Sequence, residues 1–199
     1  MLRRIIFVRI ILTIRRTKMI IARIYYPVTT LGYGKRVGIW VAGCNNNCKN
    51  CMSDNLKSMD AGVMMTIDEI LKIIDGINME IDGFTISGGE PFLQIEELKE
   101  LTKRLSQSYT DDIIVYTGYT MEWLKKKYPE AIKKITEKVS VIIDGGYIEE
   151  LNDGIGIKGS SNQKIHIFRN HRRHSNLFSA ERKVQLVKHK KGITVIGIP

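Results

Sequence analysis

The sequence predicts an α/β fold made of repeated strand–helix units, followed by a C-terminal β-hairpin. Apolar, β-branched runs of strand length recur along the chain, and helix-like segments lie between them. Because this alternation favours parallel pairing with right-handed crossovers, four or five such units would form an incomplete (βα) barrel or an open sheet. Residues 182–188 and 193–198 instead alternate like two strands around a turn at 190–192. They predict a hairpin packed on the main sheet.

The expected elements can be placed from their boundary residues. Thr66 is suited to N-cap a helix that has acidic residues in its first turn. A second helix is indicated by Leu98, Leu101 and Leu105, which are three and four residues apart. A third helix follows at Thr120, and Pro129 is expected to interrupt its pattern. The expected strands are 36–42, 83–87, 112–117 and 139–144.

The net charge of +10 is concentrated at the two ends of the 199-residue chain. Residues 1–18 hold six Lys or Arg and no acid, and residues 169–191 hold eight bases and one acid. The remaining chain holds 17 bases and 20 acids. Aromatic residues are not interleaved with the basic ones, so no nucleic-acid partner is expected.

Residues 1–18 form a basic N-terminal extension that we expect to be flexible. Its apolar stretch is split by Arg9 and closed by Arg15 and Arg16, with no small-residue cleavage site after it. The stretch is too short and too charged to span a bilayer. Two alternatives are a basic helix lying on a membrane surface and a true start at Met19. The body of the chain is expected to be cytoplasmic.

All three cysteines lie within eight residues, in the pattern Cys44-x3-Cys48-x2-Cys51 directly after the first predicted strand. An odd, clustered set is a poor disulfide framework and indicates metal or redox chemistry in a reducing compartment. A four-iron cluster normally takes four thiolates, so three would leave one iron open to an external ligand. The alternatives are a structural zinc that borrows the distant His166, and an electron-transfer cluster with a borrowed fourth ligand.

A second motif, Ser-Gly-Gly-Glu-Pro at 87–91, follows the second predicted strand. Glycines allow backbone to approach a ligand closely, and a carboxylate or carbonyl can accept from an ammonium group. Together with the cysteine loop one unit earlier, the motif resembles the radical S-adenosylmethionine superfamily. The resemblance implies a 4Fe-4S cluster on the three cysteines and S-adenosyl-L-methionine held at its methionine end by Gly88, Gly89 and Glu90. It also implies a shortened, incomplete (βα) barrel of the radical SAM type.

Further segments are similar to anaerobic ribonucleotide reductase activating proteins. They are 25–36, 116–120, 141–145 and 159–163, and they extend the resemblance over residues 19–168. The resemblance implies a glycyl radical enzyme as partner, namely anaerobic ribonucleotide reductase, and an electron donor such as flavodoxin or ferredoxin. We therefore expect a radical SAM core domain at 19–168, followed at 169–199 by a basic segment and the hairpin packed on the core.

Four further residues are candidates for contacts with the cofactor. The backbones of Asn50 and Met52 are expected near the adenine. Thr117 and Asp144 end neighbouring strands, where ligands bind in such sheets, and are candidates for ribose or carboxylate contacts. The alternatives are an ordinary strand end for Thr117 and a simple Asp-Gly turn for Asp144.

The sequence also departs from the reductase activators. Asn50 stands where they usually have glycine or an aromatic residue, and Met52 where they have tyrosine. Leu56 and Lys57 stand where those proteins commonly have a Trp, a few residues after the third cysteine. The C-terminal hairpin also extends beyond the compact form of the family. These differences keep two alternative functions open: a radical SAM enzyme acting on a peptide or small molecule, and a non-catalytic iron–sulfur electron-transfer module.

Overall fold

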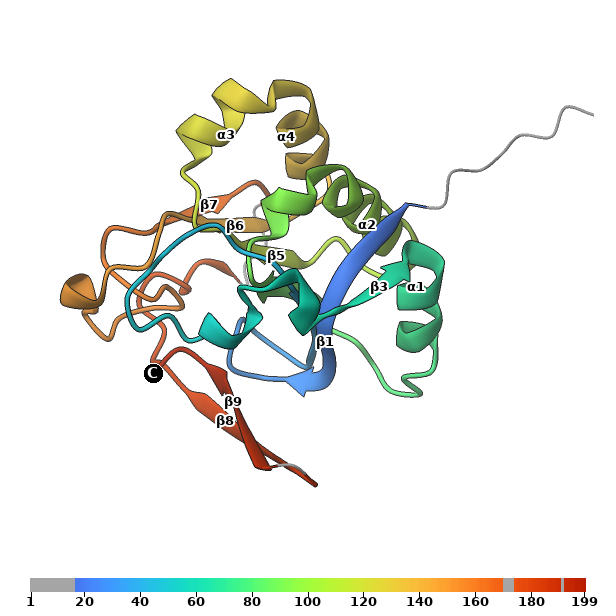
Figure 1. Ribbon diagram of the computed structural model, residues 1–199, viewed down its shortest axis with the longest axis horizontal. Coiled ribbons are helices and arrows are strands. Elements are labelled where there is room, and N and C mark those ends of the chain that lie inside the picture. Colours follow the sequence, from blue (N-terminus) through green and yellow to red (C-terminus); the bar gives the residue numbers. More distant parts are fainter. Residues whose placement is uncertain (1–16, 170–173, 191) are drawn as a thin grey trace, which may run out of the picture.

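The computed structural model describes residues 17–169, 174–190 and 192–199 as one seven-stranded sheet, flanking helices and a separate two-stranded hairpin (Figure 1). The strand order in the sheet is β3-β1-β2-β4-β5-β6-β7. The strands are β1 (Lys18–Val28), β2 (Arg36–Val41), β3 (Val63–Thr66), β4 (Gly83–Gly88), β5 (Ile113–Tyr116), β6 (Val141–Asp144), β7 (Lys164–Ile167), β8 (Val184–His189) and β9 (Gly192–Gly197). The α-helices are α1 (Ile67–Asp75), α2 (Ile95–Ser108), α3 (Met121–Lys127) and α4 (Pro129–Thr136), and the short 3₁₀ helices are η1 (Asp54–Leu56), η2 (Met59–Ala61), η3 (Pro91–Gln94) and η4 (Glu149–Leu151).

The centre of the sheet is parallel. β2, β4, β5 and β6 pair in parallel, whereas β1 and β7 run antiparallel to their neighbours β2 and β6. The α/β class, the mostly parallel sheet and the C-terminal hairpin are therefore confirmed. In the described part of the chain, β3 and β7 form the two edges of the sheet. The loops that follow β2, β4, β5 and β6 all leave from the same end of the sheet, where ligands bind in such folds.

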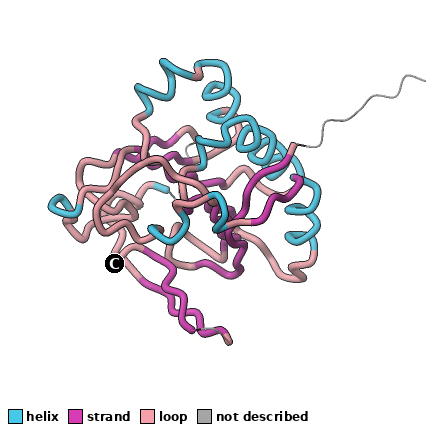
Figure 2. The backbone as a smooth tube through the Cα atoms, viewed as in Figure 1, coloured by secondary structure: helices cyan, strands magenta, loops and turns pink. Residues whose placement is uncertain are grey.

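The two faces of the sheet form two cores because successive strand residues point in opposite directions. Ile39, Ile86, Val115 and Ile142 align across the four parallel strands, are fully buried and pack in the core beneath the helices. The opposite face packs in a second apolar cluster that contains Ile114, Val141, Ile143, Ile157, Ile165 and Leu177. In Figure 2 the helices α1 to α4 lie along the top and right of the molecule, and the hairpin lies at the bottom.

The start of α1 is confirmed at the predicted cap. The Thr66 side chain accepts from the backbone N–H of Glu69, and the Glu69 carboxylate accepts from the backbone N–H of Thr66 at 2.7 Å. This reciprocal capping box satisfies two amide groups that the helix cannot pair internally.

We predict that Thr66→Ala lowers the free energy of unfolding by about 1 kcal/mol, the usual contribution of an N-cap side chain. Thr66→Ser retains the accepting hydroxyl and serves as the control. Urea unfolding followed by circular dichroism measures both variants. Equal loss in the two variants would mean that the hydroxyl is not what stabilises this helix start.

Three strands and one helix differ from the prediction. β1, β3 and β7 were not expected, and β1 begins at Lys18, inside the segment assigned to the flexible extension. Residues 1–16 of that extension lie outside the described residues. The helix that follows Thr120 ends at Lys127, before Pro129, as predicted; the helix that was not expected is α4, which begins at Pro129. Proline suits this position because its missing N–H would have no partner in the first turn.

A buried ion pair joins the strands at the end of the sheet opposite to the loops that follow β2, β4, β5 and β6. Arg36 is completely buried at the start of β2, and its Nη2 lies 2.9 Å from Oδ1 of Asp112. The same guanidinium donates to Thr85 Oγ1 and to the backbone oxygen of Phe84. His174 Nε2 lies 3.3 Å from Asp112 Oδ1. The carboxylate therefore connects the core to the segment that precedes the hairpin.

The hairpin packs against the sheet through one of its two faces. Ile196 of β9 is buried in a cluster with Val28, Leu31, Trp40 and Leu56. The other face leaves Leu186 and Ile193 largely exposed. No described helix has the length and apolar character needed to cross a membrane.

Candidate active site

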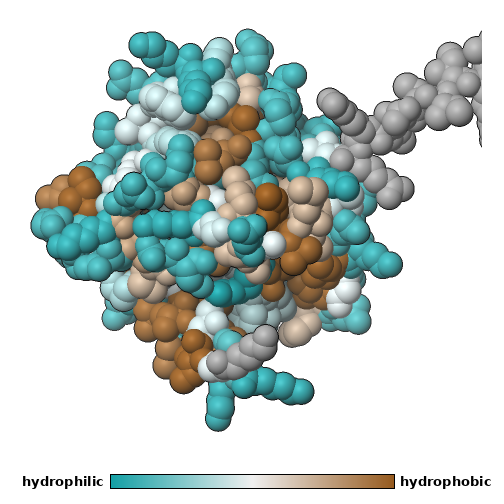
Figure 3. Space-filling model, in the orientation of Figure 1, coloured by the Kyte–Doolittle hydropathy of each residue, from teal (hydrophilic) through white to brown (hydrophobic). Residues whose placement is uncertain are grey.

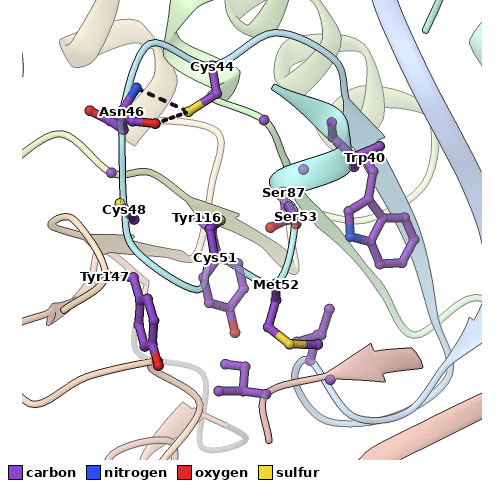
Figure 4. A pocket seen from close by; sticks show the side chains of 18 of the residues that line it. Trp40, Cys44, Asn46, Cys48, Cys51, Met52, Ser53, Ser87, Tyr116 and Tyr147 are labelled. Carbon is purple, nitrogen blue, oxygen red and sulfur yellow. Dashed lines mark hydrogen bonds between the residues drawn. The ribbon is translucent and has the colours of Figure 1, made fainter. Parts of the chain in front are cut away.

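The three cysteines lie on one loop between β2 and β3 and face one cavity. The loop is fastened at its base, where the backbone N–H groups of Gly43 and Cys44 donate to the oxygens of Leu56 and Lys57, both at 2.9 Å. Cys44, Cys48 and Cys51 are half-buried free thiols. All three line a cavity of about 680 Å³ (Figure 4), a volume typical of cofactor sites. The predicted cysteine constellation is therefore brought together in space.

Asparagines shape this loop. Asn50 has a left-handed backbone with φ of 54°, which asparagine tolerates better than most residues. The backbone N–H of Asn46 lies 3.4 Å from the Sγ atom of Cys44. Burial raises the pKa of the Cys44 thiol, and the contact with Asn46 offsets part of that rise.

The Gly-Gly-Glu motif is attached directly to the start of the cysteine loop. The backbone N–H of Gly89 donates to Val41 at 2.8 Å, and that of Glu90 donates to Gly43 at 2.7 Å. A Cβ atom on Gly88 would lie 2.5 Å from the Val41 oxygen, and one on Gly89 would lie 2.2 Å from the Gly43 oxygen. The glycines were expected to allow close approach of a ligand. In the structure they allow the close approach of two backbone segments, and both also line the cavity.

Glu90 is almost completely buried and links three parts of the site. Its Oε1 accepts from the Phe92 N–H at 3.0 Å and from the Thr117 hydroxyl at 2.8 Å. Its Oε2 accepts from the Gly118 N–H at 2.7 Å, and the Asn46 amide lies 3.4 Å away. Burial raises the pKa of Glu90 to about 7, and the hydrogen bonds to Phe92, Gly118 and Thr117 counteract only part of the rise. One carboxylate thus connects the ends of β4 and β5 with the cysteine loop.

The remaining predicted residues separate into two groups. Thr117, Asn50 and Met52 line the cavity. The Asn50 amide also donates to Glu149 at 2.5 Å, and Met52 is directed toward the hairpin (Figure 4). Asp144 does not line the cavity, because its carboxylate is used elsewhere. Its Oδ2 accepts from the Met121 N–H at 2.6 Å, and its Oδ1 lies 3.1 Å from His166 Nε2.

The donor set suits an iron–sulfur cluster. The chain has no fourth cysteine, and the three that exist are arranged around one cavity. Among the described residues, no three His, Cys, Asp or Glu side chains are grouped closely enough to hold a single metal ion. Three separated thiols fit a cluster in which each binds a different iron better than they fit a structural zinc, which needs four ligands at one point.

Comparison with known proteins gives the family. Residues 30–166 match the family described as 4Fe-4S single cluster domain. An anaerobic ribonucleoside-triphosphate reductase-activating protein from Haemophilus influenzae is 33% identical over 153 residues, which cover 73% of this chain and 96% of that protein. The chain belongs to this family of reductase-activating proteins. This result confirms the resemblance found in the sequence.

A second relative and one solved structure also match parts of the chain. The reductase-activating protein of Escherichia coli K12 is 29% identical over 153 residues, covering 73% of this chain and 97% of that protein. The crystal structure of QueE from Escherichia coli overlaps 52% of this chain and 53% of its own, at 18% identity and a TM-score of 0.45. That overlap is too small to support any inference.

Some residues of the site were not identified from the sequence. Gln163 Nε2 donates to the Gly145 oxygen at 2.6 Å, and Asn162 Nδ2 donates to the Gly146 oxygen at 2.9 Å. These bonds hold the turn after β6 at the cavity wall. Residues 193–199 of the hairpin segment also line the cavity, although they lie beyond the matched family range of 30–166. Their alternating pattern predicted a strand, but it contained no signal that places the strand beside the cysteines.

Proposed function

We propose that this protein is a radical S-adenosylmethionine activase that generates a glycyl radical on anaerobic ribonucleotide reductase. One observation carries the proposal: the loop with three cysteines and the Gly-Gly-Glu motif are hydrogen-bonded to each other at a single cavity. Membership of the reductase-activating family supports the choice of partner.

The residues have distinct proposed roles. Cys44, Cys48 and Cys51 would each bind one iron of the 4Fe-4S cluster. The segment from Gly88 to Glu90 would hold the methionine end of S-adenosylmethionine. When bound, the two cofactors supply one-electron chemistry: reductive cleavage of the sulfonium and removal of a hydrogen atom from a glycine of the partner.

Other residues would orient these groups. Asn50 and Met52 remain proposed neighbours of the adenine, since both line the cavity. Thr117 would act through Glu90, to which its hydroxyl donates, rather than through the ribose. For Asp144 we propose a structural role, because its carboxylate bonds to the first residue of α3. The open parallel sheet would correspond to the incomplete barrel, with the core at 19–168 and the basic hairpin segment at 169–199. The compartment would be the cytoplasm, where thiols stay reduced.

Anaerobic turnover tests the proposal. The reconstituted protein, reduced with dithionite and supplied with S-adenosylmethionine, is expected to form methionine and 5′-deoxyadenosine, measured by liquid chromatography. Omission of dithionite is the control and should leave the cofactor intact. A cluster-loaded protein that forms no 5′-deoxyadenosine would contradict the proposal and favour a non-catalytic electron-transfer module.

Glu90→Gln is expected to raise the dissociation constant of S-adenosylmethionine about tenfold. The new amide has no negative charge to offer the methionine ammonium, and a hydrogen bond to a charged group contributes roughly 1.5–3 kcal/mol. The wild-type carboxyl is ionised above about pH 7, so affinity should fall as the pH drops through that value. Equilibrium dialysis between pH 6 and pH 8, at steps of about half a pH unit, measures the affinity of both proteins and its dependence on pH. A pH dependence that is unchanged in the glutamine variant would contradict the role of Glu90.

A second substrate class is favoured by one observation. The hairpin segment at 193–199 lines the cavity but lies outside the family match. An added wall could adapt the cavity to a peptide or a small molecule. If the protein cleaves S-adenosylmethionine but forms no radical on a competent reductase, this second function replaces the first.

A further inference from the structure

An aromatic cluster formed by Trp123 of α3 and the flanking Tyr119 and Tyr128 reaches the surface beside the cysteine loop. The rings of Tyr119 and Trp123 are stacked with centroids 4.4 Å apart, and Tyr128 meets Trp123 edge-on at 6.1 Å. Trp123 is 38% exposed, which is unusual for a side chain of its size and apolar area. Lys127 Nζ lies 4.5 Å from the centre of the Trp123 ring. The cluster thus presents an aromatic and cationic surface to solvent.

This cluster is connected to the first cysteine through bonded and packed atoms. The Tyr119 hydroxyl donates to Asn45 Oδ1 at 2.7 Å, and Asn45 is the residue that follows Cys44. Trp123, Tyr119 and Asn45 therefore form a continuous path from the surface to the cysteine loop. Electron tunnelling is faster through such packed and hydrogen-bonded atoms than through solvent. The mechanism proposed above uses neither aromatic ring.

The surroundings of the cluster are strongly basic. Lys125, Lys126 and Lys127 are consecutive and exposed, and α4 adds Lys133 and Lys134. The two helices contain only Glu122 and Glu130 as acids. The body of the chain, by contrast, has more acids than bases when its two ends are set aside. In Figure 3, hydrophilic atoms dominate the part of the surface that α3 and α4 occupy in Figure 1.

We propose that this surface, the α3 face (Tyr119, Trp123, Lys125, Lys126 and Lys127), docks an acidic one-electron carrier protein. The lysines attract the donor, and Trp123 serves as the apolar anchor that exposed aromatic residues commonly supply at interfaces. One electron would leave the donor, which is oxidised, and pass along Trp123, Tyr119 and Asn45 to the cluster that Cys44, Cys48 and Cys51 would hold, which is reduced by one electron. No bond forms or breaks. The inference rests on the proposed function, which requires one electron per cleavage.

Charge reversal on the α3 face tests the docking. The probe is flavodoxin in its fully reduced form, mixed anaerobically with the cluster-loaded protein, with the bleaching of cluster absorbance as the readout. Lys125→Glu/Lys126→Glu is expected to slow bleaching about tenfold or more at low salt, with the difference shrinking as salt is added. Lys188→Glu/Lys190→Glu carries the same charge change on the hairpin, at the opposite end of the molecule in Figure 1, and should leave the rate unchanged.

Two ring variants separate docking from the path. Trp123→Ala should weaken flavodoxin binding about tenfold by calorimetry. Tyr119→Phe retains the ring but loses the hydrogen bond to Asn45. This variant should bind flavodoxin normally, but flavodoxin should reduce its cluster several-fold more slowly. Dithionite should reduce the cluster at an unchanged rate. Equal rates for the α3 and hairpin charge variants would overturn the docking site. If dithionite still yields 5′-deoxyadenosine in that case, the proposed function stands and only the docking surface fails.

Discussion

Cys48→Ser is expected to eliminate the cluster and to lower 5′-deoxyadenosine formation by more than about a hundredfold. This loss exceeds the one typical for residues that only hydrogen-bond to a metal ligand. The reason is the donor count. With three cysteines in the chain, no spare thiolate can replace one that is removed. The side chain lies half-buried on a loop and belongs to none of the apolar clusters, so the fold should survive the change.

Iron content and the visible absorbance of the cluster measure this result, and circular dichroism checks the fold. Asn47→Ser is the matched control, because Asn47 lies exposed on the same loop and does not line the cavity. It should retain both iron and activity. If the Cys48 variant keeps a full cluster and normal turnover, the assignment of the three cysteines to iron is wrong.

Asp112→Ala is expected to lower the free energy of unfolding by about 3–5 kcal/mol, the cost of leaving a buried charge without its partner. Arg36 has no exposed surface, and it holds its charge against the Asp112 carboxylate at 2.9 Å. Replacing both residues in Arg36→Met/Asp112→Leu removes the two charges together. The double variant should recover most of the lost stability, because buried ion pairs are often replaceable by apolar residues.

The same carboxylate gives the protein an acid-sensitive component of stability. Burial alone would raise the pKa of Asp112, but the contact with His174 and the charge of Arg36 lower it to about 2. Because the folded pKa lies below that of the unfolded chain, this stabilisation is complete above about pH 4 and is lost as the pH falls toward 2. Urea titrations of wild type and Asp112→Ala should therefore converge over this range. A stability difference that is as large at pH 2 as at pH 7 would contradict the ion-pair account.

Much of the fold followed from local patterns. The capping residues Thr66 and Thr120 and the apolar runs of β2, β4, β5 and β6 were placed within a few residues, since burial on both faces leaves a strong signal. β3 and β7 are as short as β5 and β6, but most of their residues are exposed or half-buried, so burial leaves no strong signal in their sequences. β1 is long but mixes partly buried residues on both faces, so its sequence shows no clean alternation.

The candidate site was predictable where its residues are close in sequence. The spacing of Cys44, Cys48 and Cys51 and the Gly-Gly-Glu motif identified two segments that the structure brings to one cavity. The partners of Glu90 could not be predicted, because Asn46 and Thr117 reach it only through the packing of separate strands. The same holds for the hairpin, whose position depends on the burial of Ile196 beside β1 and β2.

The most direct test of the central claim is electron paramagnetic resonance of the partner. The reconstituted protein, S-adenosylmethionine and a reductant are mixed anaerobically with the anaerobic ribonucleotide reductase of the same organism. The proposed function predicts the doublet signal of a glycyl radical, which disappears when Cys48→Ser replaces the wild-type protein. The contradicting result is a reductase that another activating protein can activate but that shows no glycyl radical signal with this protein, although 5′-deoxyadenosine accumulates. That result would mean that the reductase is not the substrate.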